Sequence, residues 1–357
     1  MTSFNLERAS GVQVNDYLSY RALIWRRFCK NRRGTIAALI LGMFYFVALF
    51  ADFFAPFEHN QIRIEARYVP PQPIHYNWNE GLYVYGLVSR QNAETMELEY
   101  EQDRNNVYSV EFFSRDITGE IRLLHSAGPM FILGTDRMGR DLLSRIIHGA
   151  RVSLTVGIFG VFLTLILGSV LGTLSGYFGG WIDHALQRVV EILASFPPIP
   201  LWMALGAALP ANWTSVQTYL GITVILSIIS WGGLAREVRG KVLVFRDQDY
   251  TTAARSAGAN HWHIISRHLL PGCYSHIIVV ATLAIPGMIL SETALSFLGL
   301  GIRAPMTSWG VLLEEAQRVT VLLNHPWLLF PALPVVFVVM AFNFLGDALR
   351  AAADPYS

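Results

Sequence analysis

The chain has 357 residues, of which 53% are hydrophobic and 15% are charged, and its formal net charge is +1. Soluble domains typically contain about 25% charged residues, so this composition favours an integral membrane protein. The near-neutral charge balance gives no indication of nucleic-acid binding. The two cysteines, Cys29 and Cys273, lie far apart in sequence without metal-ligand partners at useful spacing, so we expect neither a disulfide framework nor a zinc site.

Six apolar segments are long enough to cross a bilayer as helices, which requires roughly 20 mostly apolar residues each. The polar start of the chain lacks the apolar region of a cleavable signal peptide. Three prolines interrupt the third segment, and membrane helices tolerate proline where neighbouring helices satisfy the freed backbone groups. The expected spans cover residues 35–56, 152–177, 187–209, 218–234, 273–298 and 327–346.

Positive charges ahead of the first span place the N-terminus in the cytoplasm, because short cytoplasmic loops retain Lys and Arg. Six spans then make the C-terminus cytoplasmic as well. Four arginines near the outer start of the second span run against this rule, but long loops follow it weakly. The resulting division is a cytoplasmic segment at 1–34, a first membrane helix at 35–57, an extracytoplasmic insert at 58–133, a five-helix membrane core at 134–349 with a cytoplasmic loop at 236–272, and a cytoplasmic tail at 350–357.

The insert has a different residue pattern from the rest of the chain. Its stretches GLYVYGLVSR (81–90) and YSVEFFSRD (108–116) contain alternating aromatic or β-branched residues, which is typical of short strands. So short a segment buries little core by itself, so we expect it to rest on the helices. The predicted fold class is therefore an all-α polytopic membrane protein with six transmembrane helices and a small extracytoplasmic insert that contains some β-structure.

Small residues recur every four positions along the second expected span and share one helix face. Such a strip lets another helix approach closely in lipid. We expect the partner to be a helix of the same chain, with a helix of a second subunit as the alternative. The strip begins at Thr164 and continues through Gly168, Gly172 and Gly176.

Glu292 lies deep in the fifth expected span, after a Pro286-Gly287 break. An ionised carboxylate at membrane depth costs on the order of 3 kcal/mol or more, so its side chain should face protein or a water-filled path. Two interpretations remain open. Glu292 is either a pathway or gating residue near the outer face, or a structural hydrogen-bonding group for the outer loops.

Motifs for enzymatic chemistry are absent from the sequence. It contains no phosphate-binding G-x-x-x-x-G-K-[ST], no H-E-x-x-H, no C-x-x-C and no serine in a G-x-S-x-G setting. We therefore expect no catalytic site and no resident cofactor. His261 and His263 would point to different sides of a helix, and His268 lies two turns beyond His261, so this spacing does not favour a metal site.

The polar stretch YTTAARSAGANHWHIISRHLLP (250–271) stands between two long apolar runs. Gly258 permits a sharp chain reversal after a run of small residues, and Asn260 suits the N-cap of a second short helix. On that helix, Trp262, Ile265 and Leu269 are spaced to pack back against the bundle. The prediction is a helix-turn-helix on the cytoplasmic surface that offers small residues to a cleft on a partner protein. The residues assigned to this surface are Thr252, Ala253, Ala254, Arg255, Gly258, Ala259, Asn260 and Pro271.

The same stretch resembles the EAA loop of bacterial ABC-importer permeases, through its Ala-Ala-x3-Gly pattern followed nine residues later by HLLP. The acidic residue that opens the loop in that family is Thr252 here, so we expect contact by shape more than by charge. Further stretches resemble the C-type subunit of the dipeptide and oligopeptide branch: CKNRRG, GTDRMGRDLLSRIIHGARVSL, SGYFGGWID, ETALSFLGLGIRAPMTSWG and NFLGDALRAAADP.

In that family the loop docks a cytoplasmic ATPase and transmits its movement to the membrane helices. The resemblance therefore implies a bacterial inner-membrane subunit with four kinds of neighbour: a homologous second permease subunit, two cytoplasmic ATPases that bind the ATP, an extracytoplasmic substrate-binding protein, and the lipid bilayer. The insert and the loop at 299–306 are our candidates for touching the binding protein. The implied function is half of a translocation path for di- or oligopeptides.

Other functions remain open beside this one. The same machinery would also serve for oligosaccharides or modified peptides. An ion-coupled secondary transporter, with Glu292 as its coupling carboxylate, is an alternative of another class. A membrane scaffold or receptor whose insert senses a ligand is a third. Dependence of uptake on ATP separates the importer from both.

Overall fold

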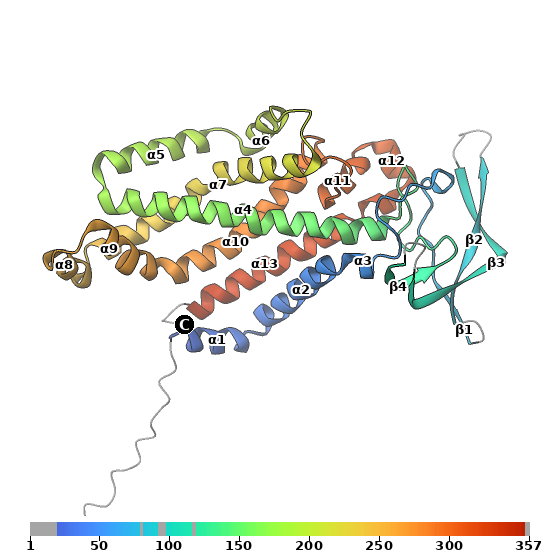
Figure 1. Cartoon of the computed structure of the whole chain (residues 1–357), viewed down its shortest axis with the longest axis horizontal. Helices are drawn as coiled ribbons and strands as arrows, with labels where there is room; N and C mark the ends of the chain where they lie inside the picture. The colour runs from blue at the N-terminus through green and yellow to red at the C-terminus, as the bar shows by residue number, and fades with distance from the viewer. Residues whose placement is uncertain (1–19, 79–80, 92–97, 116–118, 354–357) are drawn as a thin grey trace, which may run out of the picture.

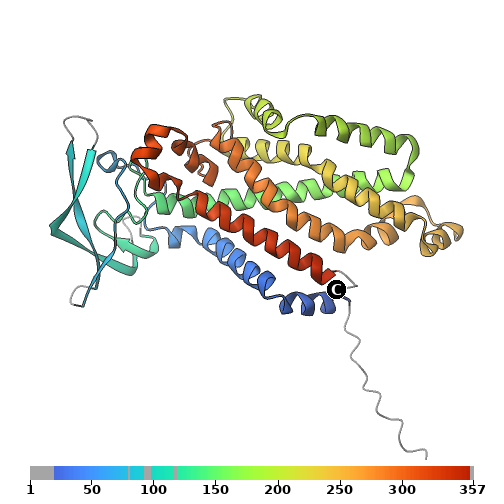
Figure 2. The ribbon, with the colours of Figure 1, turned by 180° about the vertical axis from the view of Figure 1, so that it is seen from behind.

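The computed structural model describes residues 20–78, 81–91, 98–115 and 119–353, and within them the molecule is a bundle of long helices with a small sheet at one end (Figures 1 and 2). Parts of the predicted N-terminal segment and C-terminal tail, 1–19 and 354–357, lie outside the described residues. The α-helices are α1 (Tyr20–Lys30), α2 (Arg32–Leu49), α3 (Ala51–Phe54), α4 (Leu142–Phe178), α5 (Gly180–Ser195), α6 (Pro198–Ala207), α7 (Ser215–Arg246), α8 (Asp249–Ser256), α9 (His261–Ile264), α10 (Leu270–Phe297), α11 (Trp309–Glu314), α12 (Val319–Asn324) and α13 (Ala332–Ala353).

Five helical segments of the described chain are long and apolar enough to cross a membrane: Arg32–Leu49, Leu142–Phe178, Ser215–Arg246, His261–Phe297 and Pro326–Ala353. Helices α5 and α6, whose axes meet at 90°, make a sixth crossing if they form one broken span. The predicted third span is thus two helices, and the bend falls where Pro197 and Pro198 follow Phe196. The predicted class, a helical membrane protein with a small sheet in its insert, is confirmed.

The boundaries of several helices differ from the expected ones. The first long helix ends at Leu49 rather than at residue 57, and the short helix α3 follows it. Helix α4 begins at Leu142, well before residue 152, because the Asp141 side chain caps it by accepting from the Ser144 N–H at 2.7 Å. Helix α7 continues to Arg246, so the start of the predicted loop at 236–272 is helical.

Ion pairs explain most of the arginines near the start of α4. Arg140 donates to Asp136 at 2.7 Å, and Arg145 forms a buried ion pair with the same carboxylate. Arg151 donates to Asp52 at 2.8 Å. Partial burial acts to raise the pKa of Asp52, but hydrogen bonds from His148 and Arg151 lower it to about 2. The contacts of Asp52 tie α3 to α4, whereas those of Asp136 fix the segment just before α4, so these arginines have structural partners.

His59 lies in the same junction and stacks on His148, with ring centroids 4.3 Å apart. Both ring nitrogens of His148 face acceptors, the Ser144 carbonyl oxygen and the Asp52 carboxylate, each at 2.9 Å. Burial, together with the positive charges of His148 and Arg145, lowers the pKa of His59 to about 4. The folded protein therefore holds His59 neutral.

This depressed pKa predicts an acid-sensitive contribution to stability. An unfolded histidine titrates near pH 6.5, so between about pH 6.5 and pH 4 the unfolded chain binds a proton that the folded chain does not, and stability falls on acidification. His59→Gln removes this titration. We expect the unfolding temperature of the variant to fall less than that of the native protein over this window, in thermal melts at several pH values. Parallel curves would contradict the assignment.

The insert is a four-stranded antiparallel sheet in the order β1-β2-β3-β4, and it lies beyond the end of the helices opposite α8 and α9 (Figure 1). Strand β2 coincides with the first predicted alternating stretch, and β3 contains most of the second. Val84 and Val110 turn their side chains inward and pack with Phe57 and Phe131 from the flanking chain. Segments next to the membrane helices thus complete the hydrophobic core of the insert. The strands are β1 (His75–Asn77), β2 (Gly81–Gln91), β3 (Leu98–Arg115) and β4 (Ile121–Ser126).

The strip of small residues on α4 faces α7 of the same chain. A β-carbon added at Gly172 would lie 2.5 Å from the Ala235 carbonyl oxygen, and one at Gly176 would lie 2.9 Å from the Arg239 carbonyl oxygen. At Gly168 the nearest atoms belong to Leu234. The two helix backbones therefore approach so closely that only glycine fits between them.

We expect Gly172→Leu to lower the free energy of unfolding by about 1–3 kcal/mol, because the new side chain must push α7 away. Gly240→Ala is the matched control, since Gly240 lies on α7 and a β-carbon there meets no atom within 4 Å. Thermal unfolding of the purified variants, followed by fluorescence, measures both. Equal stability of the two variants would show that α4 and α7 do not need this close approach.

Candidate functional site: the α8–α9 surface and the cavity behind it

Helices α8 and α9 form a compact projection at the end of the bundle opposite the insert (Figures 1 and 2). Helix α8 ends at Ser256, and Gly258 then takes the left-handed φ of 83° that reverses the chain. Asn260 caps α9 by accepting from the His263 N–H at 2.7 Å. The predicted helix-turn-helix is present, with its reversal and its cap at Gly258 and Asn260.

The tip of this projection is made of small, accessible residues. Ala257 and Gly258 are exposed at the reversal, and a β-carbon on Gly258 would meet nothing within 4 Å. Ala254 and Ala259 are half-buried against the hydrophobic cluster beneath them. Among the remaining residues assigned to this surface, the exposed ones are Thr252, Ala253, Arg255, Asn260 and Pro271.

The prediction for Trp262 was wrong. Its side chain is 67% exposed, whereas Ile264, Ile265 and Leu269 are buried at 0%, 5% and 0%. Helix α9 is only one turn long, and residues Ile265–Leu269 continue it as a π-helix. The wider turn shifts the apolar face by one position, so Ile264 takes the inward place. Trp262 therefore adds a large aromatic group to the exposed surface.

The projection is bonded to the ends of α4 and α7. The Tyr177 hydroxyl and His261 Nδ1 share a hydrogen bond of 2.8 Å, and the Arg255 guanidinium lies 6.0 Å from the centre of the Tyr177 ring. The buried Thr251 hydroxyl donates to the Phe245 carbonyl oxygen at 2.9 Å. Hydrogen bonds thus join α8 and α9 to two long helices.

A second tie lies just behind, where the chain turns from α4 into α5. Arg239 on α7 donates two hydrogen bonds to Asp183, from Nε at 2.5 Å and from Nη2 at 2.6 Å. Ser175 on α4 donates to the same carboxylate at 2.5 Å. A paired guanidinium and carboxylate of this kind fixes orientation as well as distance. Sequence spacing alone does not reveal this pairing, although Asp183 lies in the stretch SGYFGGWID.

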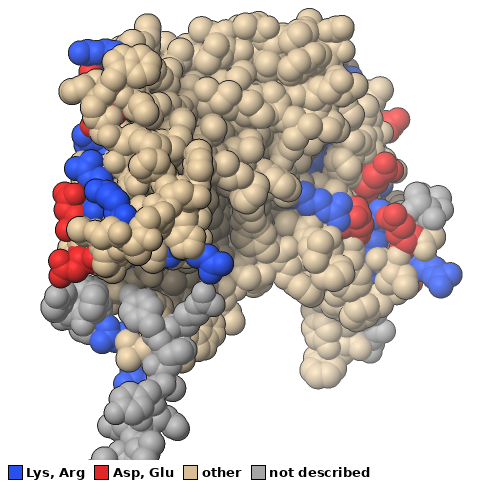
Figure 3. Space-filling model, turned by 60° about the vertical axis from the view of Figure 1, so that its left-hand side comes forward, with Lys and Arg blue, Asp and Glu red and all other residues tan. Residues whose placement is uncertain are grey.

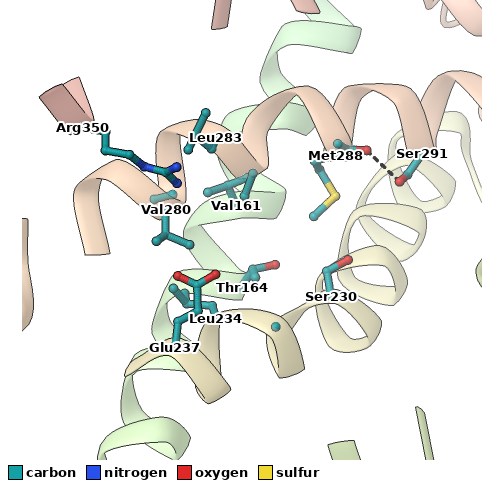
Figure 4. Close-up of a pocket in the computed structure, with 14 residues that line it drawn as sticks. Val161, Thr164, Ser230, Leu234, Glu237, Val280, Leu283, Met288, Ser291 and Arg350 are labelled. Carbon is teal, nitrogen blue, oxygen red and sulfur yellow. Dashed lines mark hydrogen bonds between the residues drawn. The ribbon is translucent and has the colours of Figure 1, made fainter. Parts of the chain in front are cut away.

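A cavity of about 460 Å³ lies among the helices that these ties hold (Figure 4). Its wall is mostly aliphatic, with hydroxyl groups from Thr164, Ser230 and Ser291. Glu237 of α7 and Arg350 of α13 stand at one end of it in the close-up. The remaining lining residues are Val161, Gly233, Leu234, Val280, Ala281, Leu283, Ala284, Gly287 and Met288.

Glu292 does not line this cavity; it is fully buried among α4, α10 and the start of α11. The hydroxyls of Ser296 and Ser308 donate to its Oε1 atom at 2.7 and 2.8 Å. Ser153 of α4 donates to Oε2 at 3.4 Å and accepts from the Trp309 N–H at 3.1 Å. This geometry favours the structural interpretation of Glu292 over the pathway or gating one.

A second cavity, of about 470 Å³, opens between the insert and the loop before α11. Tyr68 and Arg137 line one side, and Arg303 and Arg318 line the other. Burial raises the pKa of the Glu315 carboxyl in its wall, and the neighbouring Asp136 carboxylate raises it further. The cavity is therefore polar and rich in arginine.

The loop histidines lie apart rather than around one point. His261 bonds to Tyr177, and the rings of His263 and His268 are 5.8 Å apart between centroids. Within the described part of the chain, no group of three or more His, Cys, Asp or Glu side chains is arranged to hold a metal ion.

Comparison with known proteins identifies the class to which this bundle and its projection belong. Residues 168–356, more than half of the chain, match the family described as binding-protein-dependent transport system inner membrane component. Residues 19–71 match the N-terminal transmembrane domain of oligopeptide transport permease C. The chain belongs to the former family, whose members are membrane subunits of ABC importers rather than enzymes.

Three relatives show which branch it resembles. Over 223 residues it is 43% identical to the glutathione transport system permease protein GsiD of Pectobacterium atrosepticum, covering 62% of this chain and 72% of that protein. It is 42% identical over 223 residues to the dipeptide transport system permease protein DppC of Alkalihalophilus pseudofirmus, covering 62% and 71%. It is also 42% identical over 224 residues to the oligopeptide transport system permease protein OppC of Haemophilus influenzae, covering 62% and 69%.

Proposed function

We propose that this chain supplies one half of the membrane path through which an ATP-driven importer carries short peptides. The observation that carries the proposal is the tie between the exposed α8–α9 projection and the helices α4 and α7 that line the cavity of about 460 Å³. The names of three relatives, which refer to glutathione, dipeptides and oligopeptides, support peptides as the cargo.

The motor in this proposal is a pair of separate cytoplasmic ATPases. ATP binding closes the ATPase dimer, and a cleft on one ATPase holds the tip around Gly258 and moves it. Movement of the tip displaces α4 and α7 together, since Tyr177 and Thr251 bond the tip to both. Moving such an equilibrium from 1:99 to 99:1 requires about 5.5 kcal/mol of differential binding. ATP and the loaded binding protein supply it jointly.

The proposed orientation places both termini in the cytoplasm with the projection. Helix α1 packs on the last turns of α13 through Phe28 and Ala348, so the described ends of the chain lie at one end of the bundle. The cations that precede and begin α2 lie there too, as short cytoplasmic segments favour. Figure 3 shows charged residues gathered on two sides of the molecule, separated by a broad band without them. That band is what the bilayer would cover.

The cavity of about 470 Å³ beside the insert lies on the outer side in this orientation, and it is our candidate contact for the extracytoplasmic binding protein. It joins Tyr68 of the insert to the Arg303–Met306 part of the loop singled out in the sequence. Its exposed guanidiniums, those of Arg303 and Arg318, fit acidic side chains on the binding protein. The second subunit completes the translocation path by facing the helices that line the inner cavity.

Reconstitution of the whole importer in vesicles tests this function. Vesicles that contain the chain, its partner permease and the ATPases should accumulate labelled di- or oligopeptides only when ATP and the loaded binding protein are both present. Accumulation of oligosaccharides in place of peptides would overturn the cargo and leave the machinery intact. Accumulation driven by an ion gradient without ATP would overturn the proposal as a whole.

A further inference from the structure

A narrow groove of about 210 Å³ runs between α2 and α13. Each helix contributes one stripe with the spacing i, i+3, i+4 and i+7, which is one face of an α-helix. The lining is apolar except for one cation at its end. The stripe on α2 consists of Arg33, Ile36, Ala37 and Ile40, and the stripe on α13 consists of Phe337, Met340, Ala341 and Phe344.

Two alanines give the groove its depth. Ala37 and Ala341 are 2% and 3% exposed and form the floor, whereas Ile36 and Phe337 are 58% and 56% exposed and form the rims. The chain runs in opposite directions along α2 and α13 (Figure 1). Arg33 therefore lies at the end of the groove nearest α1, and the groove continues from it for about 10 Å at 1.5 Å per residue.

The groove opens to the side of the molecule that lipid covers. Both helices belong to segments able to cross a membrane, and they lie at the edge of the bundle away from α5 and α6 (Figures 1 and 2). Leu39, next to the groove on α2, is 75% exposed. Such an apolar exterior is stable only in contact with acyl chains or with another apolar helix.

The charge at the mouth of the groove selects between lipids. Residues 20–49 contain six Lys and Arg and no Asp or Glu. Within the described chain, Arg33 forms no ion pair and is exposed at the second residue of α2. Trp25 of α1, at the same end, is 66% exposed, as is typical of an indole at the level of the lipid headgroups.

From these observations we infer that the groove between α2 and α13 binds one phospholipid with an anionic headgroup. Arg33 holds the phosphate, and one acyl chain lies along Ile36 and Ile40 over the two alanines. Neighbouring cations add a general attraction for an anionic surface. The assignment of this lipid to the cytoplasmic leaflet rests on the proposed orientation of the chain, whereas the site itself does not.

Photocrosslinking with phosphatidylglycerol that carries a diazirine on its acyl chain tests the site. The assembled importer is placed in nanodiscs, and crosslinked peptides are located by mass spectrometry. We expect labelling of α2 and α13 at the groove, and at least tenfold less with the matching phosphatidylcholine probe. Both lipids carry the phosphate, but the choline cation leaves phosphatidylcholine without net charge, so the cluster of cations around Arg33 attracts it less. Arg33→Gln should lower the phosphatidylglycerol signal about tenfold, and Arg26→Gln, at an exposed position of α1, much less.

A second pair of variants separates the groove from the general attraction of the cations. Ile36→Trp fills the groove without a change of charge and should abolish labelling there. Leu39→Trp adds the same bulk beside the groove and should leave labelling unchanged. Equal labelling by both lipids, or labelling that survives Ile36→Trp, would overturn the inference. Crosslinks from the groove to the partner permease would also overturn it, because they would make the groove a subunit interface.

Discussion

Gly258→Trp should leave the chain folded in the membrane and reduce ATP-dependent uptake at least tenfold. The substitution adds a large ring at the tip of the α8–α9 projection, where a β-carbon meets no neighbour within 4 Å in the isolated chain. The folded subunit therefore has room for the ring, but a partner cleft shaped to the small tip does not. Uptake by reconstituted vesicles and co-purification of the ATPases are the two measurements.

The left-handed backbone at Gly258 requires a matched control. Any side chain is strained at a φ of 83°, and asparagine tolerates this region better than other residues. Gly258→Asn therefore carries the backbone strain with little bulk, and we expect it to keep most of the uptake. Full uptake by Gly258→Trp would refute docking at this tip. Equal loss in both variants would assign the effect to the backbone instead.

Glu292→Ala should lower the free energy of unfolding by about 2–4 kcal/mol, because buried hydroxyl groups lose their acceptor in a place that water does not reach. Those hydroxyls belong to Ser153, Ser296 and Ser308, which come from α4, α10 and the start of α11. Thermal unfolding of the purified subunit measures the loss.

Glu292→Gln separates the structural role from the gating role. The amide oxygen still accepts from the serines, so we expect a smaller loss of stability than with alanine and uptake in proportion to the folded protein. A glutamine variant of nearly native stability that transports nothing would support a gating or ion-coupling carboxylate, which is the alternative that the sequence left open.

Local chemistry made the centre of the projection predictable. Gly258 and Asn260 act through their own backbone preferences, and the cap and the reversal occur where those preferences put them. Trp262 could not be predicted in the same way. The side chain of Trp262 points outward because the helix continues as a π-helix at Ile265–Leu269. That wider turn shifts the helix register by one residue, and the sequence does not show it. The bend after α5 was signalled by its prolines, but the sequence does not give its angle of 90°.

Contacts between distant parts of the chain also lay beyond the sequence. By the charge rule, Arg140, Arg145 and Arg151 conflict with the expected orientation. In the structure they pair with Asp136 and Asp52. The ion pair between Asp183 and Arg239 joins residues 56 positions apart. Composition and periodicity identify the elements, and only the folded chain shows which side chains meet.

A crosslink between the projection and an ATPase tests the central claim most directly. Cysteine is placed by Ala257→Cys at the tip, in a chain that carries Cys29→Ser to remove the exposed native thiol. Trp78→Cys, 89% exposed in the insert at the other end of the molecule, is the control. With a short bifunctional maleimide reagent and the assembled importer, the account predicts a crosslink to the ATPase from position 257 alone, in a yield that changes when ATP binds. An actively hydrolysing importer that gives no such crosslink at 257, or gives one at 78, would contradict it.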